Sequence, residues 1–172
     1  MQNTLIAAVV YQDNEAFKAM QTLWQVVKQL RKEGIKVAGL INKCDDDGQA
    51  IDAIIQSITD NREYTILQCL GTDTIGCRLN PTALAESSEV LREAILQKPD
   101  VLFINRFGVS ESEGRGLLAE FTAAILAGIP VVSLVNQKYF LHWQEFSAGF
   151  GQKLTIDLNQ IVNWIKERNN LL

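Results

Sequence analysis

The chain has 172 residues, and its hydrophobic share of 47% and charged share of 21% are ordinary for a globular protein. That length suits one domain, over residues 1–172, with a full hydrophobic core. A net charge of −4, and the lack of any apolar run near the ~20 residues that span a bilayer, predict no nucleic-acid partner and no membrane insertion.

The first strand, helix and strand form a predicted βαβ unit. Residues 5–11 are a continuous apolar run, which favours a strand buried on both faces. Gly34 ends the helix that follows the polar residues 12–15, and residues 36–42 are the next strand. The helix carries apolar side chains at spacings of three and four, as on a face packed against a sheet: Phe17, Met20, Leu23, Trp24, Val27 and Leu30.

A β-hairpin is predicted next. Residues 53–59 and 63–69 are two β-type runs around a polar turn, and we expect them to pair beside the parallel sheet. A helix over residues 50–58 stays open as an alternative, because periodicity alone does not separate the two. The aspartate-rich turn at residues 45–48 lacks the later ligands of a calcium loop, so no metal site is expected there.

The second half of the chain alternates helices with buried strands. Asn80 is a predicted N-cap, with Pro81 in the first turn of a helix that continues to about residue 95. Strands are predicted at residues 101–105 and 131–135, with helices at about 115–126 and 158–165. This alternation predicts a three-layer α/β sandwich: a mostly parallel sheet, helices on both faces and a hairpin insertion.

Site chemistry is expected in the loop after the strand at residues 101–105. Ligands of open α/β sheets bind where the parallel strands end, and this strand ends in Asn105 and Arg106. Loops at residues 12–15, 105–115 and 136–138 would then share one edge of the sheet. That edge would collect six polar side chains: Asn105, Arg106, Glu111, Glu113, Arg115 and Asn136.

Three glycines in the same loop predict an anion cradle. Backbone N–H groups beside Gly108, Gly114 and Gly116 could bind an anion, with Arg106 and Arg115 gripping two of its oxygens. The alternative is purely structural: the glycines serve turns, and Arg106 pairs with Glu111 or Glu113 to hold the loop.

A second candidate segment is formed by Cys77 and Arg78, just before the helix that begins near Pro81. A helix N-terminus acidifies a thiol and favours anions, so Cys77 is a candidate reactive residue and Arg78 a third cation. An idle thiol is the competing interpretation, since the single histidine, His142, lies among aromatic residues far along the chain. Three cysteines without metal-site spacing favour reduced thiols and a cytoplasmic protein.

The segment after the first strand lacks the phosphate-binding pattern G-x-x-x-x-G-K-[ST]. It reads Tyr-Gln-Asp-Asn-Glu-Ala-Phe over residues 11–17, where Asp13 and Glu15 would repel a triphosphate. Ordinary P-loop catalysis is therefore not expected, because its lysine and its magnesium-binding hydroxyl are both missing.

Two motifs carry a resemblance to a known family. Cys-Arg-Leu-Asn-Pro at residues 77–81 and Asn-Arg-Phe-Gly-Val-Ser-Glu-Ser-Glu-Gly-Arg-Gly at residues 105–116 resemble an uncharacterised bacterial domain family whose genes often lie beside those for molybdate uptake. The resemblance covers nearly the whole chain. That family commonly has aspartate at the position of Asn80 and lysine at that of Arg106, so a carboxylate is lost while the positive charge is kept.

More remotely, the chain is similar to the small thermophile-type nucleoside-triphosphatases. In that family the corresponding strand ends in Asp-Glu, followed by a glycine and a glutamate at the spacing of Gly108 and Glu111. Here Asn105 and Arg106 replace the acidic pair that would bind magnesium. The resemblance implies a P-loop-like fold that has lost its usual hydrolytic chemistry.

These observations predict a non-catalytic or weakly catalytic module that binds a small oxyanion or phosphorylated ligand. Molybdate or a molybdenum-cofactor intermediate is implied by the family resemblance alone. One alternative is a nucleotide or phosphoester hydrolase with Glu111 or Glu113 as its base. Another is a regulatory subunit that docks on a partner through the aromatic segment near Trp143, although core packing would also explain those aromatic residues. A homodimer is a further alternative.

Overall fold

The apolar runs of the sequence become neighbouring strands in the computed structural model, which describes residues 4–47, 50–68 and 78–171. The described residues form a seven-stranded sheet in the order β4-β3-β2-β7-β8-β1-β9. Its strands are β1 (Ile6–Tyr11), β2 (Val37–Cys44), β3 (Ala50–Ser57), β4 (Glu63–Thr65), β7 (Val101–Ile104), β8 (Val131–Asn136) and β9 (Gln152–Leu154). A separate antiparallel pair is formed by β5 (Leu67–Gln68) and β6 (Arg78–Leu79).

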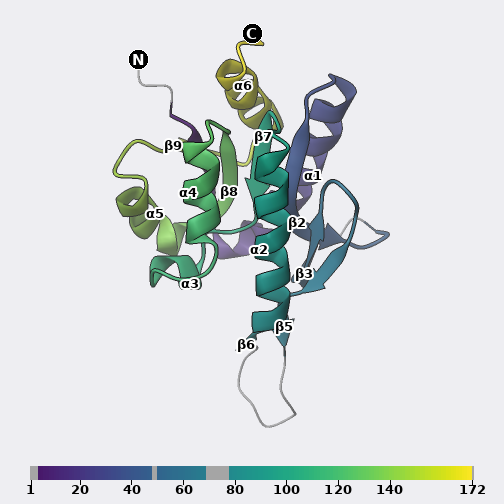
Figure 1. Cartoon of the computed structure of the whole chain (residues 1–172), viewed down its shortest axis with the longest axis vertical. Coiled ribbons are helices and arrows are strands. Elements are labelled where there is room, and N and C mark those ends of the chain that lie inside the picture. The colour runs from purple at the N-terminus through teal and green to yellow at the C-terminus, as the bar shows by residue number, and fades with distance from the viewer. Residues whose placement is uncertain (1–3, 48–49, 69–77, 172) are drawn as a thin grey trace.

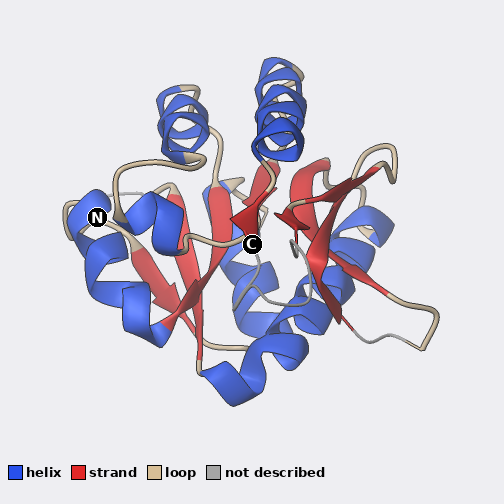
Figure 2. Cartoon of the chain, turned by 90° about the horizontal axis from the view of Figure 1, so that it is seen from below, coloured by secondary structure: helices blue, strands red, loops and turns tan. Residues whose placement is uncertain are grey.

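Helices cover both faces of this sheet (Figures 1 and 2). One face packs against α1 (Ala16–Lys32) and α6 (Leu158–Arg168), and the other against α2 (Pro81–Leu96), α4 (Leu118–Leu126) and α5 (Phe140–Phe146). Shorter elements are α3 (Val109–Ser112) and the 3-10 helices η1 (Asp13–Glu15) and η2 (Gln137–Tyr139). The predicted three-layer α/β sandwich is confirmed.

The central strands are buried on both faces, which explains their continuous apolar sequences. In β1, Ala7 and Val9 face the core formed with α1 and α6, whereas Ile6 and Ala8 face the core formed with α2 and α4. All four residues of β7 are buried. Because successive side chains alternate between faces, one short strand contributes to two cores.

The predicted hairpin is also confirmed. Strands β3 and β4 pair antiparallel, with Ile55 opposite Tyr64, and β3 pairs antiparallel with β2. The helix considered for residues 50–58 is therefore wrong. Five strands run parallel, β2, β7, β8, β1 and β9, and the hairpin extends the sheet beyond β2.

Three local predictions need correction. Phe17, expected on the buried face of the first helix, is 55% exposed, because α1 begins only at Ala16 and Phe17 lies in its first turn. The helix expected from Arg115 begins at Leu118, and a short helix, α3, forms within the segment predicted as a loop. Strand β9, which pairs parallel with β1, was not predicted.

The sheet has a topological switch point between β1 and β8. From β1 the chain passes through α1 to β2, on the far side of β8 and β7. From β8 it passes through α5 to β9, on the far side of β1. The two connections leave in opposite directions and over opposite faces, so a crevice is expected at the carboxyl ends of these two strands.

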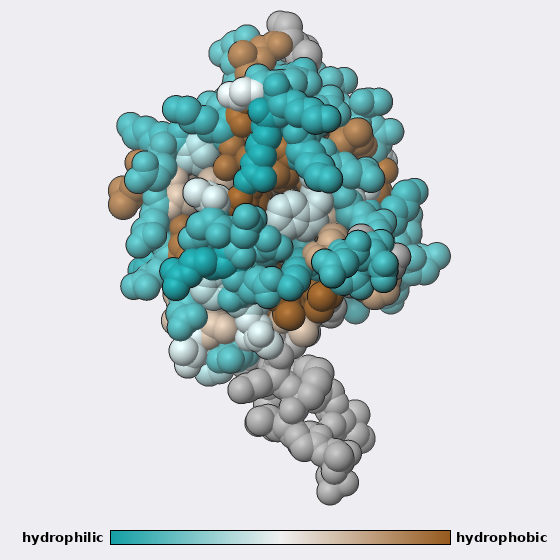
Figure 3. Space-filling model, turned by 90° about the vertical axis from the view of Figure 1, so that its right-hand side faces the viewer, coloured by the Kyte–Doolittle hydropathy of each residue, from teal (hydrophilic) through white to brown (hydrophobic). Residues whose placement is uncertain are grey.

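Figure 3 shows one face of the molecule, on which hydrophilic side chains predominate and hydrophobic ones gather only in small patches. In the part of the chain that the structure describes, no helix has both the length and the apolar character needed to cross a membrane.

Candidate functional site at the carboxyl edge of the sheet

A cavity of about 330 Å³ lies at the carboxyl ends of three neighbouring parallel strands. Tyr11 ends β1, Asn105 directly follows β7, and Asn136 ends β8. Figure 1 shows α3 and the start of α2 at this same, lower end of the molecule. The cavity is lined by Tyr11, Ile55, Ile66, Leu84, Asn105, Arg106, Phe107, Gly108, Val109, Ser110, Glu111, Gly116, Leu117, Asn136, Lys138 and Tyr139.

Arg106 lines the cavity at a point where the backbone stops hydrogen-bonding to β2 and begins to hydrogen-bond to β8. The N–H of Asn105 donates to the carbonyl of Leu40 in β2, at 2.9 Å, and that of Phe107 donates to the carbonyl of Leu134 in β8, at 3.0 Å. Between these two bonds Arg106 has a φ of 54°, in the left-handed region that a non-glycine residue adopts only where its surroundings impose it. Its guanidinium is close enough to lower the pKa of Glu111.

Asn105 forms a buried amide pair with Asn42 of β2. Its Nδ2 donates to Asn42 Oδ1, while Asn42 Nδ2 donates to the carbonyl of Ile51 at 3.0 Å. Asn105 is only 9% exposed, and its Oδ1 has no hydrogen-bond partner among the described residues. A buried acceptor without a donor is uncommon, and here it belongs to a side chain that lines the cavity.

The glycine loop that follows is closed by the carboxylate of Glu111. Its Oε2 accepts from the N–H of Gly108 at 3.1 Å, and its Oε1 accepts from the N–H of Leu117 at 3.2 Å. The amide of Gly114 donates to the Glu111 carbonyl at 3.1 Å, and that of Arg115 to the Ser110 carbonyl at 2.8 Å. The prediction of free amides is therefore wrong at Gly108, Gly114 and Arg115, because the chain supplies its own acceptors.

Burial raises the pKa of Glu111 above its ordinary value of 4.5. The side chain is 9% exposed, so its charged form loses most of its hydration. Hydrogen bonds from the amides of Gly108 and Leu117, and the charge of Arg106, oppose that rise. The carboxylate oxygens of Glu111 thus hold the loop together at a position where burial disfavours the charged form.

The structure separates the site residues predicted within the loop at residues 105–116 into two groups. Asn105, Arg106, Gly108, Glu111 and Gly116 come together around the cavity. The residues that do not line it are Glu113, Gly114 and Arg115. Glu113 and Arg115 instead form an exposed ion pair with each other.

The second candidate segment contributes little to this picture. Cys77 lies outside the described residues. The backbone of Arg78 pairs with Gln68 between β6 and β5. Asn80 does cap α2 as predicted: its Oδ1 accepts from the N–H of Thr82 at 3.1 Å and of Ala83 at 3.3 Å.

The loops after β1 and β8 meet at the switch point, as predicted. Asn136 Nδ2 donates to Asp13 Oδ1 at 2.7 Å, and Lys138 Nζ lies 3.9 Å from the same oxygen. The N–H of Gln12 donates to Glu15 Oε1 at 2.9 Å, so a compact acidic turn stands after β1 where a phosphate-binding loop would be. Lys138 is a second cation in the lining of the cavity, and no sequence motif predicted it as a site residue.

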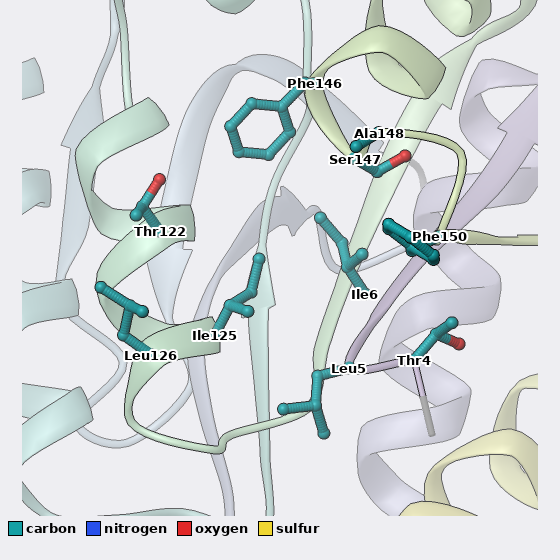
Figure 4. Close-up of a pocket in the computed structure, with 10 residues that line it drawn as sticks. All are labelled: Thr4, Leu5, Ile6, Thr122, Ile125, Leu126, Phe146, Ser147, Ala148 and Phe150. Carbon is teal, nitrogen blue, oxygen red and sulfur yellow. The ribbon is translucent and has the colours of Figure 1, made fainter. Parts of the chain in front are cut away.

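A larger cavity, of about 500 Å³, lies elsewhere in the molecule (Figure 4). It opens between the start of β1, the end of α4 and the turn that follows α5. None of its ten lining residues is charged, and none is a predicted site residue. Ten described residues line it: Thr4, Leu5, Ile6, Thr122, Ile125, Leu126, Phe146, Ser147, Ala148 and Phe150.

A comparison with models of protein families shows to which family this chain belongs. The model of the family described as "Protein of unknown function (DUF2478)" matches residues 6–164. The chain belongs to this family. The resemblance drawn from the motifs at residues 77–81 and 105–116 is thereby confirmed.

A curated relative of this DUF2478 chain is the "Molybdenum import ATP-binding protein ModC 2" of Bradyrhizobium diazoefficiens (strain JCM 10833 / BCRC 13528 / IAM 13628 / NBRC 14792 / USDA 110). The two are 31% identical over 167 residues, which is 96% of this chain. The chain spans only 18% of that relative's length.

Among solved structures, the DUF2478 chain is similar to one described as "Solution Structure of a Human Cancer-Related Nucleoside Triphosphatase". The TM-score is 0.64, with 94% of this chain and 97% of the other covered, at 11% sequence identity. The expected P-loop NTPase-like fold is therefore confirmed.

Proposed function

We propose that the pocket at the carboxyl ends of β1, β7 and β8 binds a small anionic ligand, an oxyanion or a phosphorylated molecule, without P-loop hydrolysis. The observation that carries this proposal is the presence of Arg106 and Lys138 in the lining of one cavity at the switch point. Open α/β sheets bind ligands at that point, and two cations from different loops supply the attraction that an anion needs.

The turn after β1 argues against binding through a P-loop. A P-loop presents glycine amides and a lysine to the phosphates, whereas this turn presents Asp13 and closes on itself through Gln12 and Glu15. The ModC 2 relative is named for ATP binding, but the chain corresponds to 18% of it and contains no G-x-x-x-x-G-K-[ST] motif. We therefore do not extend ATP binding to this chain.

Molybdate stays a candidate ligand. The matched relative is named as a molybdenum import protein. A tetrahedral oxyanion carries the charge that Arg106 and Lys138 would attract.

One observation favours the alternative of a hydrolase. The raised pKa of Glu111 is what a general base requires, and its side chain lines the cavity. Against this role, both carboxylate oxygens already accept hydrogen bonds from the loop backbone. Phosphate release from nucleotides with magnesium, lost in Glu111→Gln while the fold persists, would favour the enzyme.

The alternative of docking through the aromatic segment has less support. Trp143 is 1% exposed and stacks on Phe140, with ring centroids 5.8 Å apart, so it belongs to the core.

Calorimetric titration with phosphate, sulfate, molybdate, tungstate and nucleotides tests the binding proposal. For any anion that binds the wild type, Arg106→Ala and Lys138→Ala should each raise the dissociation constant at least tenfold. Arg115→Ala is the matched control, because Arg115 does not line the cavity and pairs with Glu113. No heat from any of these anions with folded protein, or an equal loss in Arg115→Ala, would refute the proposal.

A further inference from the structure

We infer that the ligand of this pocket is a ring compound with one anionic group and an N–H donor, of the class of the nucleoside monophosphates, and not a bare oxyanion. The inference rests on the proposed function, since it concerns the same cavity. Four features of the pocket support it: its volume, its apolar wall, an unsatisfied acceptor and the balance of its charges.

The volume exceeds what an oxyanion fills. A tetrahedral anion with four oxygens, each about the size of a water molecule, occupies on the order of 100 Å³. The cavity measures about 330 Å³, which lies in the range of pockets for small organic ligands. A bare oxyanion would leave most of the cavity to water.

Part of the cavity lining, which we call the apolar wall, is hydrophobic. Ile55 of β3, Ile66 after β4, Leu84 of α2 and Tyr139 of η2 come from four separate segments and line the same space. Ile66, Leu84 and Tyr139 are only partly buried, although they pack against the core. A flat ring against this wall would bury the apolar surface that an inorganic anion leaves wet.

The carbonyl oxygen of Asn105 requires a donor. Asn42 Nδ2 is committed to the backbone carbonyl of Ile51, so Asn42 Oδ1 faces Asn105 and accepts from its Nδ2. This chain of bonds fixes which end of the Asn105 amide is the acceptor, and that acceptor has no partner among the described residues. A ring N–H or exocyclic amino group of a ligand would satisfy this oxygen, whereas molybdate and sulfate dianions carry no hydrogen to donate.

The charges around the cavity favour a single anionic group. Arg106 and Lys138 are the cations of the lining, and both have an acidic neighbour. Asp13 lies 3.9 Å from Lys138, and Glu111 is influenced by the charge of Arg106. A triphosphate would bring more negative charge toward these two carboxylates than a single phosphate does, and the repulsion would be correspondingly greater.

Titrations that vary one part of the ligand at a time test the inference. AMP and GMP carry ring and anion, ribose 5-phosphate and inorganic phosphate carry the anion alone, and adenosine carries the ring alone. We expect AMP or GMP to bind at least tenfold more tightly than ribose 5-phosphate, adenosine or ATP.

Two variants identify the parts of the pocket. Leu84→Ala removes part of the apolar wall, and Asn105→Leu replaces the acceptor with an apolar side chain of similar size. Each variant should reduce the ratio of the dissociation constants of ribose 5-phosphate and AMP at least fivefold. Leu96→Ala, at a 79% exposed position of the same helix as Leu84, is the matched control and should not change it. Circular dichroism and thermal unfolding, which do not depend on any ligand, show whether Leu84→Ala and Asn105→Leu are folded.

The outcomes separate this inference from the proposed function. If ribose 5-phosphate or phosphate binds as tightly as AMP and GMP, the inference is overturned and the anion site stands. If adenosine binds as tightly as AMP, the claim that the ligand needs an anionic group is refuted. If none of the anions binds, the proposed function fails and the inference with it.

Discussion

The carboxylate of Glu111 occupies the space that a side chain at position 116 would need. A Cβ built on Gly116 would lie 2.3 Å from Glu111 Oε1, and Gly116 has a φ of 68°. Steric space and backbone conformation thus both demand glycine there. The loop over residues 108–117 is shaped around a buried carboxylate of its own chain.

Gly116→Ala should therefore destabilise the protein by about 2–5 kcal/mol, the sum of a left-handed backbone at alanine and an overpacked contact. Gly114→Ala is the matched control. Gly114 also has a positive φ, 81°, but a Cβ there would meet no atom within 4 Å, so it should lose only about 1–2 kcal/mol. Urea unfolding at neutral pH measures both, and equal losses would show that the contact with Glu111 does not matter.

Glu111 should also make the stability of the protein depend on pH. A raised pKa means that the folded state binds the proton more tightly than the unfolded state. Between the ordinary value of 4.5 and the raised pKa, this group's contribution to the free energy of unfolding falls as pH increases. Acidification through that window should thus stabilise the wild type relative to Glu111→Gln, which cannot take up the proton.

The measurement is the difference in free energy of unfolding between wild type and Glu111→Gln at a series of pH values from 4.5 upward. At neutral pH the variant should be less stable by about 1–3 kcal/mol, because an amide accepts through one oxygen only and leaves the N–H of Gly108 or Leu117 unpaired. A difference that is constant with pH would show that Glu111 titrates alike in both states.

The order and burial of the strands could be predicted because they depend on short-range pattern. Residues 5–11 form a continuous apolar run, and residues 131–135 are apolar except for Ser133. Such runs are typical of strands covered on both faces, and their alternation with helices implies a parallel sheet. Asn80 followed by Pro81 marked the start of α2 for a local reason as well, since a capping side chain accepts from the amides two and three residues further on, here those of Thr82 and Ala83.

The inner arrangement of the site could be predicted only in part. The carboxyl edge and the meeting of its loops follow from topology, but the cradle of free amides does not exist at Gly108, Gly114 and Arg115. A local signal was available: glycine at position 108 and glutamate three residues later fit the spacing of a capping box, which predicts that Glu111 bonds back to the Gly108 amide.

The apolar wall had no such signal. Ile55, Ile66 and Leu84 lie far from residues 105–116 in sequence, and they reach the cavity only through the packing of the β3–β4 hairpin and α2 against the parallel strands. A pairing between strands β2 and β3 fixes that placement, and periodicity within one segment carries no information about its neighbours.

Gly39 should be essential for the contact between β2 and β7. A Cβ at this position would lie 2.0 Å from the carbonyl oxygen of Phe103 in the neighbouring strand, and φ is 122°. Gly39→Ala must push two buried strands apart, and we expect a loss of at least about 3 kcal/mol. Thermal unfolding compares it with Gly34→Ala, where φ is 76° but a Cβ would meet nothing within 4 Å. A smaller loss at position 39 than at position 34 would contradict the close approach.

Asp13 should set how strongly the pocket attracts an anion. Its Oδ1 accepts from Asn136 Nδ2 at 2.7 Å and lies 3.9 Å from Lys138 Nζ, so its charge offsets that of the lysine. Asp13→Asn keeps the size and an acceptor oxygen but removes the negative charge. Binding of AMP or phosphate should therefore tighten by about 2–10-fold, which corresponds to a gain below about 1.4 kcal/mol for an exposed pair.

Titration calorimetry at two salt concentrations checks this expectation for Asp13→Asn. The gain should shrink at high salt, because exposed charges are screened. Glu89→Gln changes the net charge equally, and its exposed residue does not line the cavity, so it separates the local effect from that of overall charge. An equal gain in both variants would mean that the anion responds to the net charge of −4 and not to the neighbour of Lys138. Weaker binding in Asp13→Asn would mean that the carboxylate holds Lys138 in place for the ligand.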